Sequence, residues 1–304
     1  RKMKLNLQDI RQSANLELLA RQLVEGFITG LHKSPYHGFS VEFAEHRLYN
    51  EGESTRHIDW KAYARTDRLF TKQYEEETNL RCLIAIDTSP SMFYPAETKA
   101  KIRFSAIAAA AMAYMLNLQR DAVGLCLFSD KIDTLTPVKS SASHLEKLLI
   151  LLHGIMNQQP GKSQTQIARV LHEAAEKIHK RSLVVLFSDM FDGDQEHAEE
   201  IFKALQHLKH NKHEVIVFHV MDYDTELTFQ FEDKPIEFID LESNAKLKLN
   251  PGDIRESYTQ EALKFYDNLK LRCHQYKIDF VKADVREDVN TILQTYLIKR
   301  AKMK

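Results

Sequence analysis

Apolar residues gather along this chain in short continuous runs that alternate with longer segments of helical periodicity. Runs of strand length occupy residues 83–87, 122–128, 183–189 and 215–220, and polar residues bound each of them. Apolar side chains at every position, rather than at every second one, indicate strands that are covered on both faces. The pattern therefore predicts an α/β fold with a doubly wound, mostly parallel sheet.

The segments between these runs predict helices. Residues 101–118 are apolar almost all round, which indicates a buried helix. Apolar side chains spaced by three to four residues predict further helices over residues 167–178 and 258–273. An edge strand, a small excursion of strands and a last strand before a closing helix are expected at residues 131–138, 226–249 and 278–281.

The first 79 residues are predicted to be an extension that packs on a main domain at residues 80–304. This extension begins with a helix whose apolar stripe is Leu16, Leu19, Leu23, Phe27 and Leu31. Residues 41–77 then combine short alternating runs with aromatic side chains, and about 40 residues are too few to bury these in a core of their own. We therefore expect five residues to attach this extension to the sheet domain rather than to form a partner-binding surface: Arg56, Asp59, Trp60, Lys61 and Arg65.

Composition narrows the classes of function. The chain has 304 residues, a formal net charge of -1 and a balanced mixture of acids and bases. This balance gives no electrostatic support for nucleic-acid binding. No apolar run is long enough to span a membrane, and the basic, polar start has no apolar signal core. We therefore expect a cytoplasmic protein without a membrane span and without a nucleic-acid partner.

One apolar run, LIAID, leads directly into oxygen-bearing side chains at Asp87, Ser89 and Ser91. Alternate residues of an extended chain lie on the same side, so these three side chains converge at the end of a strand. A plain turn, with Asp87 and Ser89 bonded to nearby backbone amides, explains the same motif. Asp189 ends another predicted strand and Thr165 opens a helix between them, which favours one shared edge of the sheet. Oxygen ligands alone suit Mg²⁺ or Mn²⁺.

This combination resembles the metal-ion-dependent adhesion site of a von Willebrand factor type A domain, whose sheet is Rossmann-like. The resemblance implies a metal ion held by five side chains, those of Asp87, Ser89, Ser91, Thr165 and Asp189. Families of this fold usually have G-G-T at the threonine, whereas this chain has GKSQT. Ser163 is therefore an alternative to Thr165 as a ligand.

The run RLYNEGESTRHIDWKAYARTDRLFTKQYEEE resembles the signature of the DUF58 family, roughly R-x-Y-x-x-G-D/E followed by R-x-I-D-W-K and A-R. Glu53 stands where the shorter acid is common, and HVMDYDTELTF, FIDLES and ILQTYLIKR resemble the later part of that family. Its members are typically encoded beside MoxR-type AAA+ ATPases. The resemblance thus implies a non-catalytic, metal-dependent adaptor for assembly or maturation of protein complexes, in which a partner's carboxylate completes the coordination of Mg²⁺.

Other chemistry has weaker support. HEAAEKIH, from His172, resembles the zinc motif H-E-x-x-H, but Glu176 stands where the second histidine is required. His207, His210 and His213 are spaced by three beside lysines, which favours a solvated surface over a metal site. The main alternative to an adaptor is an enzyme that uses the same Mg²⁺ as a Lewis acid, such as a phosphohydrolase, although no catalytic residue is assigned.

Overall fold

The chain divides into two compact units in a computed structural model. One unit comprises Arg1–Pro35 together with Arg81–Lys304, and the other is Tyr36–Leu80. The sequence instead predicts one boundary near residue 79, and the packing of the extension on the main domain stays a prediction. The structure describes residues 7–28, 42–48, 60–75, 80–159, 161, 166–190, 195–241 and 245–302.

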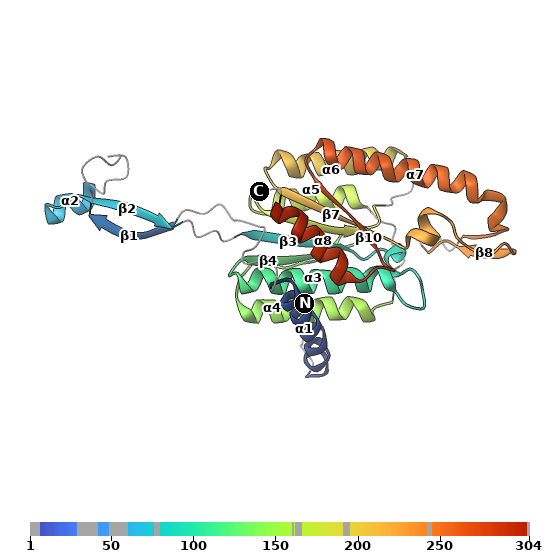
Figure 1. Ribbon diagram of the computed structural model, residues 1–304, viewed down its shortest axis with the longest axis horizontal. Helices are drawn as coiled ribbons and strands as arrows, with labels where there is room; N and C mark the ends of the chain where they lie inside the picture. Colours follow the sequence, from blue (N-terminus) through green and yellow to red (C-terminus); the bar gives the residue numbers. More distant parts are fainter. Residues whose placement is uncertain are drawn as a thin grey trace. The chain divides into compact units, whose positions relative to one another are not determined.

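The larger unit is built on a sheet whose strand order, within the described residues, is β10-β7-β6-β3-β4-β5 (Figure 1). Every neighbouring pair is parallel except β4 and β5, which are antiparallel. The expected α/β fold with a mostly parallel sheet is therefore confirmed. The strands are β3 (Arg81–Asp87), β4 (Ala122–Phe128), β5 (Ile132–Leu135), β6 (Leu183–Ser188), β7 (Glu214–Met221) and β10 (Asp279–Asp284).

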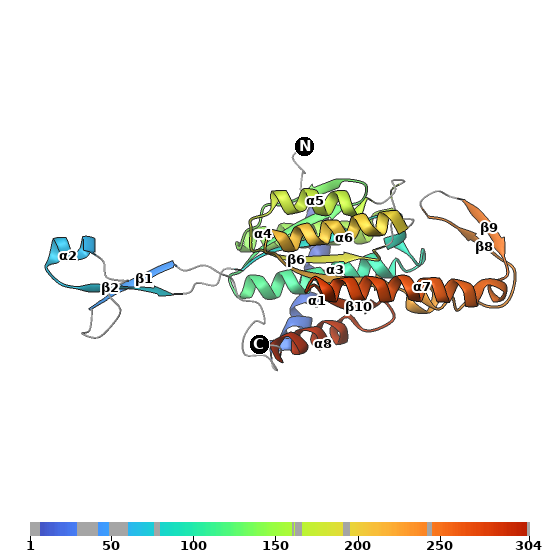
Figure 2. The same ribbon diagram turned by 90° about the horizontal axis from the view of Figure 1, so that it is seen from above.

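Helices cover both faces of this sheet, which explains why its central strands are apolar at nearly every position (Figures 1 and 2). One face of the sheet is covered by α5 (Ile167–Lys177), α6 (Gln195–His210) and α7 (Pro251–Gln275). Leu83 and Ala85 of β3 belong to the core on this face. The opposite face carries α1 (Leu7–Ile28), α3 (Ala100–Leu118), α4 (Ala142–Asn157) and α8 (Val289–Lys302).

Helix α1 packs against α3 and α4, and its packing follows the predicted stripe only in part. Among the side chains described in this helix, Leu16, Ala20 and Val24 are buried at intervals of four residues, whereas Leu19 is 37% exposed. The side chain of Phe27 and the residue Leu31, also in the predicted stripe, lie outside the described part of the chain. A row of residues four apart lies along one side of a helix, so it fits between two neighbouring helices. Small alanine at position 20 allows this close approach, and periodicity based on leucine alone misses it.

The smaller unit contains an antiparallel pair, β1 (Glu42–Leu48) and β2 (Phe70–Glu75), and the short helix α2 (Trp60–Thr66). Trp60 is 62% exposed, and its ring meets that of Tyr63 edge-on with 6.3 Å between centroids. A tie between this tryptophan and the sheet domain stays a prediction.

A π-helical turn, η3 (Tyr223–Leu227), follows β7 and leads into the hairpin of β8 (Ile236–Ile239) and β9 (Lys246–Leu249). The expected excursion of strands is thus confirmed, although it opens with a turn of helix. Across the described ranges, no helix combines the length and apolarity needed to cross a lipid bilayer.

Candidate metal centre

Asp87 is the last residue of β3, and its side chain is completely buried. The backbone N–H of Ser89 donates to Asp87 Oδ1 at 2.9 Å, which is the local contact expected of a plain turn. The hydroxyl of Ser188, at the end of the adjacent strand β6, donates to Asp87 Oδ2 at 2.8 Å. Both carboxylate oxygens are therefore fixed in direction, one by the turn and one by the neighbouring strand.

The loop after β3 is anchored so that two serine hydroxyls meet. Thr88 donates to the carbonyl oxygen of Phe128, at the end of β4, through its N–H at 2.7 Å and its hydroxyl at 2.8 Å. Pro90 then begins a short 3-10 helix, η2 (Pro90–Phe93), because proline fits the first turn of a helix. As a result, Ser89 Oγ and Ser91 Oγ lie 3.0 Å apart, with Ser89 buried and Ser91 half-buried.

Asp189 follows β6 directly, is buried, and forms an ion pair that the sequence does not reveal. Its Oδ2 lies 2.8 Å from Lys101 Nζ, and the same ammonium lies 2.7 Å from Glu226 Oε1. Lys101 comes from the first turn of α3 and is completely buried. Sequence reasoning missed Lys101 and Glu226, although a lysine opening an otherwise apolar helix is a signal that could have found the first.

The electrostatics of this cluster point to missing positive charge. Burial, followed by the negative charge of Asp189, raises the pKa of Asp87 to about 7, despite the hydrogen bonds from Ser89 and Ser188. Burial alone would lower the pKa of Lys101, but the carboxylates of Asp189 and Glu226 outweigh it and raise that pKa. The ammonium is thus kept charged. Within the described residues, the one buried cation pairs with Asp189 and Glu226, and no ion pair is formed by Asp87.

Most of the predicted ligands come from two neighbouring strands. Four of them lie at the carboxyl ends of β3 and β6, at one edge of the sheet: Asp87, Ser89, Ser91 and Asp189. Thr165 and its alternative Ser163 fall outside the described residues. Gln166, the next residue after Thr165 in the sequence, donates its N–H to the carbonyl of Ser129, just beyond β4, at 3.2 Å.

This donor set fits a hard divalent cation. A buried carboxylate with a raised pKa is relieved when a cation stands beside it, and hydroxyl and carboxylate oxygens are the ligands that Mg²⁺ and Mn²⁺ prefer. No three or more His, Cys, Asp or Glu side chains gather in a metal-holding group within the part of the chain that the structure describes.

Comparison with known proteins identifies the family. The family described as "Protein of unknown function DUF58" matches residues 45–265, which is more than half of the chain. The chain belongs to the DUF58 family. The resemblance inferred from the motifs is thereby confirmed at the level of the family.

Two curated relatives of this DUF58 protein are the uncharacterized proteins Rv1480 of Mycobacterium tuberculosis and Mb1516 of Mycobacterium bovis. Each is 25% identical over 174 residues, which is 57% of this chain and 55% of the relative. The chain thus spans about half the length of the curated relatives it matches.

Two solved structures show a partial resemblance to the chain. The conserved hypothetical protein BatB of Bacteroides thetaiotaomicron is 14% identical, with a TM-score of 0.43 over 73% of this chain and 99% of that one. An aerotolerance-related membrane protein of Bacteroides fragilis is also 14% identical, with a TM-score of 0.45 over 74% of this chain and 100% of that one.

The histidines of the two sequence patterns in this DUF58 protein, around His172 and around His207, form contacts that their spacing does not predict. Packing of α5 on α6 brings His172 Nδ1 within 3.0 Å of His207 Nδ1, and His207 Nε2 lies 3.0 Å from Glu176 Oε1. His213 is buried, and its Nδ1 accepts the N–H of Ser182 at 3.1 Å. The expected solvated surface is therefore wrong for His213.

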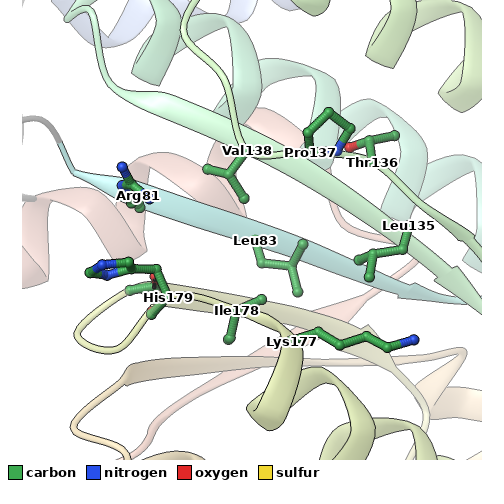
Figure 3. A pocket seen from close by; sticks show the side chains of 10 residues that line it. Arg81, Leu83, Leu135, Thr136, Pro137, Val138, Lys177, Ile178 and His179 are labelled. Atoms are coloured by element: carbon green, nitrogen blue, oxygen red, sulfur yellow. Dashed lines mark hydrogen bonds between the residues drawn. The ribbon is translucent and has the colours of Figure 1, made fainter.

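A separate hollow of about 470 Å³ lies at the opposite edge of the sheet, where β3 and β6 begin (Figure 3). Leu83 and Ile178 form part of its apolar lining, while Arg81, Lys177 and His179 supply basic groups around it. It shares no residue with the candidate metal centre. The hollow and the candidate metal centre are therefore separate sites.

Proposed function

We propose that this DUF58 chain is a metal-dependent protein-binding adaptor, and that its larger unit works as a von Willebrand factor type A domain. The observation that carries the proposal is the state of Asp87. This buried carboxylate stands beside Asp189 with a pKa raised to about 7, at the edge of a parallel sheet where ligands are commonly bound. A bound cation would stabilise the ionised form of this carboxylate.

The ligands we assign to Mg²⁺ or Mn²⁺ are Asp87, Ser89, Ser91 and Asp189, together with Thr165 from the motif. A bound ion would supply an open coordination position that a carboxylate of another protein can fill. The chain's own residues hold the hydroxyls together and fix the direction of the Asp87 carboxylate. Neutral hydroxyl ligands leave more positive charge on the ion than carboxylates would, which favours an acidic partner.

The partner that we propose is a MoxR-type AAA+ ATPase, in the assembly or maturation of protein complexes. The support is the DUF58 membership together with the absence of G-x-x-x-x-G-K-[ST] from the sequence, so that ATP would be bound by the partner. A cytoplasmic location accords with this partner and stays a prediction.

Metal and partner binding test the proposal directly. Titration of the full chain with Mn²⁺, followed by electron paramagnetic resonance, should show one site that Asp87→Ala abolishes. An immobilised MoxR-type ATPase should capture the chain in Mg²⁺ and release it in chelator. The double variant Ser89→Ala/Ser91→Ala should lose both activities, since it removes the paired hydroxyls.

A matched control is available in the same unit. Ser141 and Ser143 form another pair of serines two residues apart, exposed and with hydroxyls 3.4 Å from each other. Replacing both with alanine should leave Mn²⁺ binding and capture unchanged. Capture that persists in chelator, or in the Ser89/Ser91 variant, would refute the adaptor mechanism. Hydrolysis of phosphate esters in Mg²⁺ that Asp87→Ala removes would favour the phosphohydrolase instead.

A further inference from the structure

Lys101 is the only lysine or arginine that is buried among the residues that the structure describes. Its position is doubly unfavourable for a cation. Burial removes the ammonium from water, and the first turn of a helix presents the positive end of the helix dipole. A buried ion pair stabilises a fold little better than a well-packed apolar side chain would. The charge of Lys101 therefore calls for a role other than stability.

Glu226 is held in place independently of Lys101. Its Oε2 accepts the backbone N–H of Asp222 at 2.8 Å, and its carbonyl oxygen accepts the hydroxyl of Tyr258 at 2.8 Å. Asp222 is in turn fixed by Arg286, whose Nε donates to its carboxylate at 2.8 Å. The remaining oxygen of Glu226, Oε1, thus stands as a fixed acceptor for the ammonium of Lys101.

Asp189 is in a different situation, because the ammonium and the proposed metal ion would share it. Its Oδ2 accepts from Lys101 at 2.8 Å, and its negative charge also acts on Asp87. A divalent ion beside Asp87 would stand close to the ammonium, and two cations that share a carboxylate repel each other. Binding of one therefore weakens the hold of the other on Asp189.

We propose that Lys101 is an internal cation that competes with the metal for Asp189, while Glu226 anchors the ammonium when Asp189 turns to the metal. This inference rests on the proposed metal site. Lys101 keeps the metal affinity of the chain alone low, so that a partner's carboxylate, which restores negative charge, is needed for tight binding. Lys101 and Glu226 are positioning residues in this account.

Mn²⁺ titration of single variants provides the first test. Lys101→Met removes the competitor and should tighten Mn²⁺ binding by about tenfold or more, whereas Lys101→Arg keeps the charge and should stay near the wild type. Glu226→Gln leaves the ammonium to Asp189 alone and should weaken binding by about tenfold. Lys246→Met and Glu237→Gln, from an exposed ion pair on the β8–β9 hairpin, should change nothing.

A double-mutant cycle separates competition from a general change of charge. If Glu226 acts through Lys101, Glu226→Gln should have no effect on Mn²⁺ affinity once Lys101 is methionine. An equal weakening in both backgrounds would overturn the inference. Should Lys101→Met fail to fold, Glu226→Gln decides, and an unchanged affinity in that variant would overturn it as well.

Failure of this inference differs from failure of the proposed function. Should Mn²⁺ bind neither the wild type nor any variant, the metal site itself is wrong. Should the wild type bind Mn²⁺ through Asp87 while Lys101→Met and Glu226→Gln bind equally well, only the competition is wrong.

Discussion

Ser188 donates its hydroxyl proton to Asp87 across the junction of β6 and β3, at a distance of 2.8 Å between Oγ and Oδ2. Ser188 Oγ in turn accepts the N–H of Met190 at 2.9 Å. Ser188 is therefore a buried link between the two strands that carry the candidate metal centre. It is not itself among the residues that the adhesion-site motif would assign to the ion.

Ser188→Ala should accordingly weaken the fold without removing a metal ligand. The change leaves the N–H of Met190 without its acceptor, and we expect a loss of about 1–3 kcal/mol in the free energy of unfolding. It should also raise the pKa of Asp87 further, since the hydroxyl bond lowers it. Urea denaturation measures the first effect. Ser257→Ala, an exposed helical control, should cost no more than about 0.5 kcal/mol.

The metal-free protein should lose stability as pH rises. The pKa of Asp87 is about 7 in the folded chain against an ordinary value of 3.8, so the folded state retains a proton that the unfolded state releases. Between these values the free energy of unfolding should fall with rising pH, by up to about 4 kcal/mol. Asp87→Asn should flatten this slope in chelator, as followed by denaturation at pH 5, 6 and 7.

His219 provides the internal check on that experiment. Burial lowers its pKa to about 4, so its contribution has the opposite sign and is lost as pH falls below its ordinary value of 6.5. Because His219 is present in both proteins, it cancels in the difference between wild type and Asp87→Asn. Parallel pH profiles for the two proteins would contradict the raised pKa of Asp87.

Mg²⁺ should stabilise the wild type and leave Ser89→Ala/Ser91→Ala unaffected. A ligand at one hundred times its dissociation constant adds about 2.7 kcal/mol to the free energy of unfolding. Without metal, the double variant should lose only about 1 kcal/mol, the net worth of the hydrogen bond between the two hydroxyls. Thermal melts with Mg²⁺ and with chelator measure both quantities, and an equal rise in melting temperature for the two proteins would exclude the serines as ligands.

Leu16→Ala should destabilise the larger unit by about 2–3 kcal/mol, because this side chain is buried where α1 packs on α3 and α4. Leu18→Ala, two residues away and 55% exposed, should cost no more than about 0.5 kcal/mol. Circular dichroism melts compare the variants. Equal effects would mean that the register of α1 is not the one described.

The strands are predictable from the sequence where polar residues mark both of their ends. The pattern predicts a strand over residues 122–128, which is β4 without change, because polar Asp121 and Ser129 bound an apolar run. Only the contiguous part of the candidate site, the D-x-S-x-S loop, is predictable from the sequence. The ion pairs of Lys101 are not, because its partners lie 88 and 125 residues away and no periodic pattern connects residues so far apart.

The error at His213 has a physical origin. His213 has charged neighbours in the sequence, yet it is buried and its ring accepts the backbone N–H of Ser182, 31 residues away. Its burial therefore depends on a partner that is distant in the sequence.

The order of strands also determines when the candidate metal centre is assembled during synthesis. Strand β3 lies between β4 and β6, so its first partner follows soon after it, whereas Ser188 leaves the ribosome 101 residues after Asp87. Until then one edge of β3 has no hydrogen-bonding partner, and such edges invite association with other chains. Long-range parallel pairing is also slow. The nascent chain is therefore most prone to aggregate in the interval before β6 arrives. The pairing of β6 that closes that edge of β3 also completes the candidate metal centre.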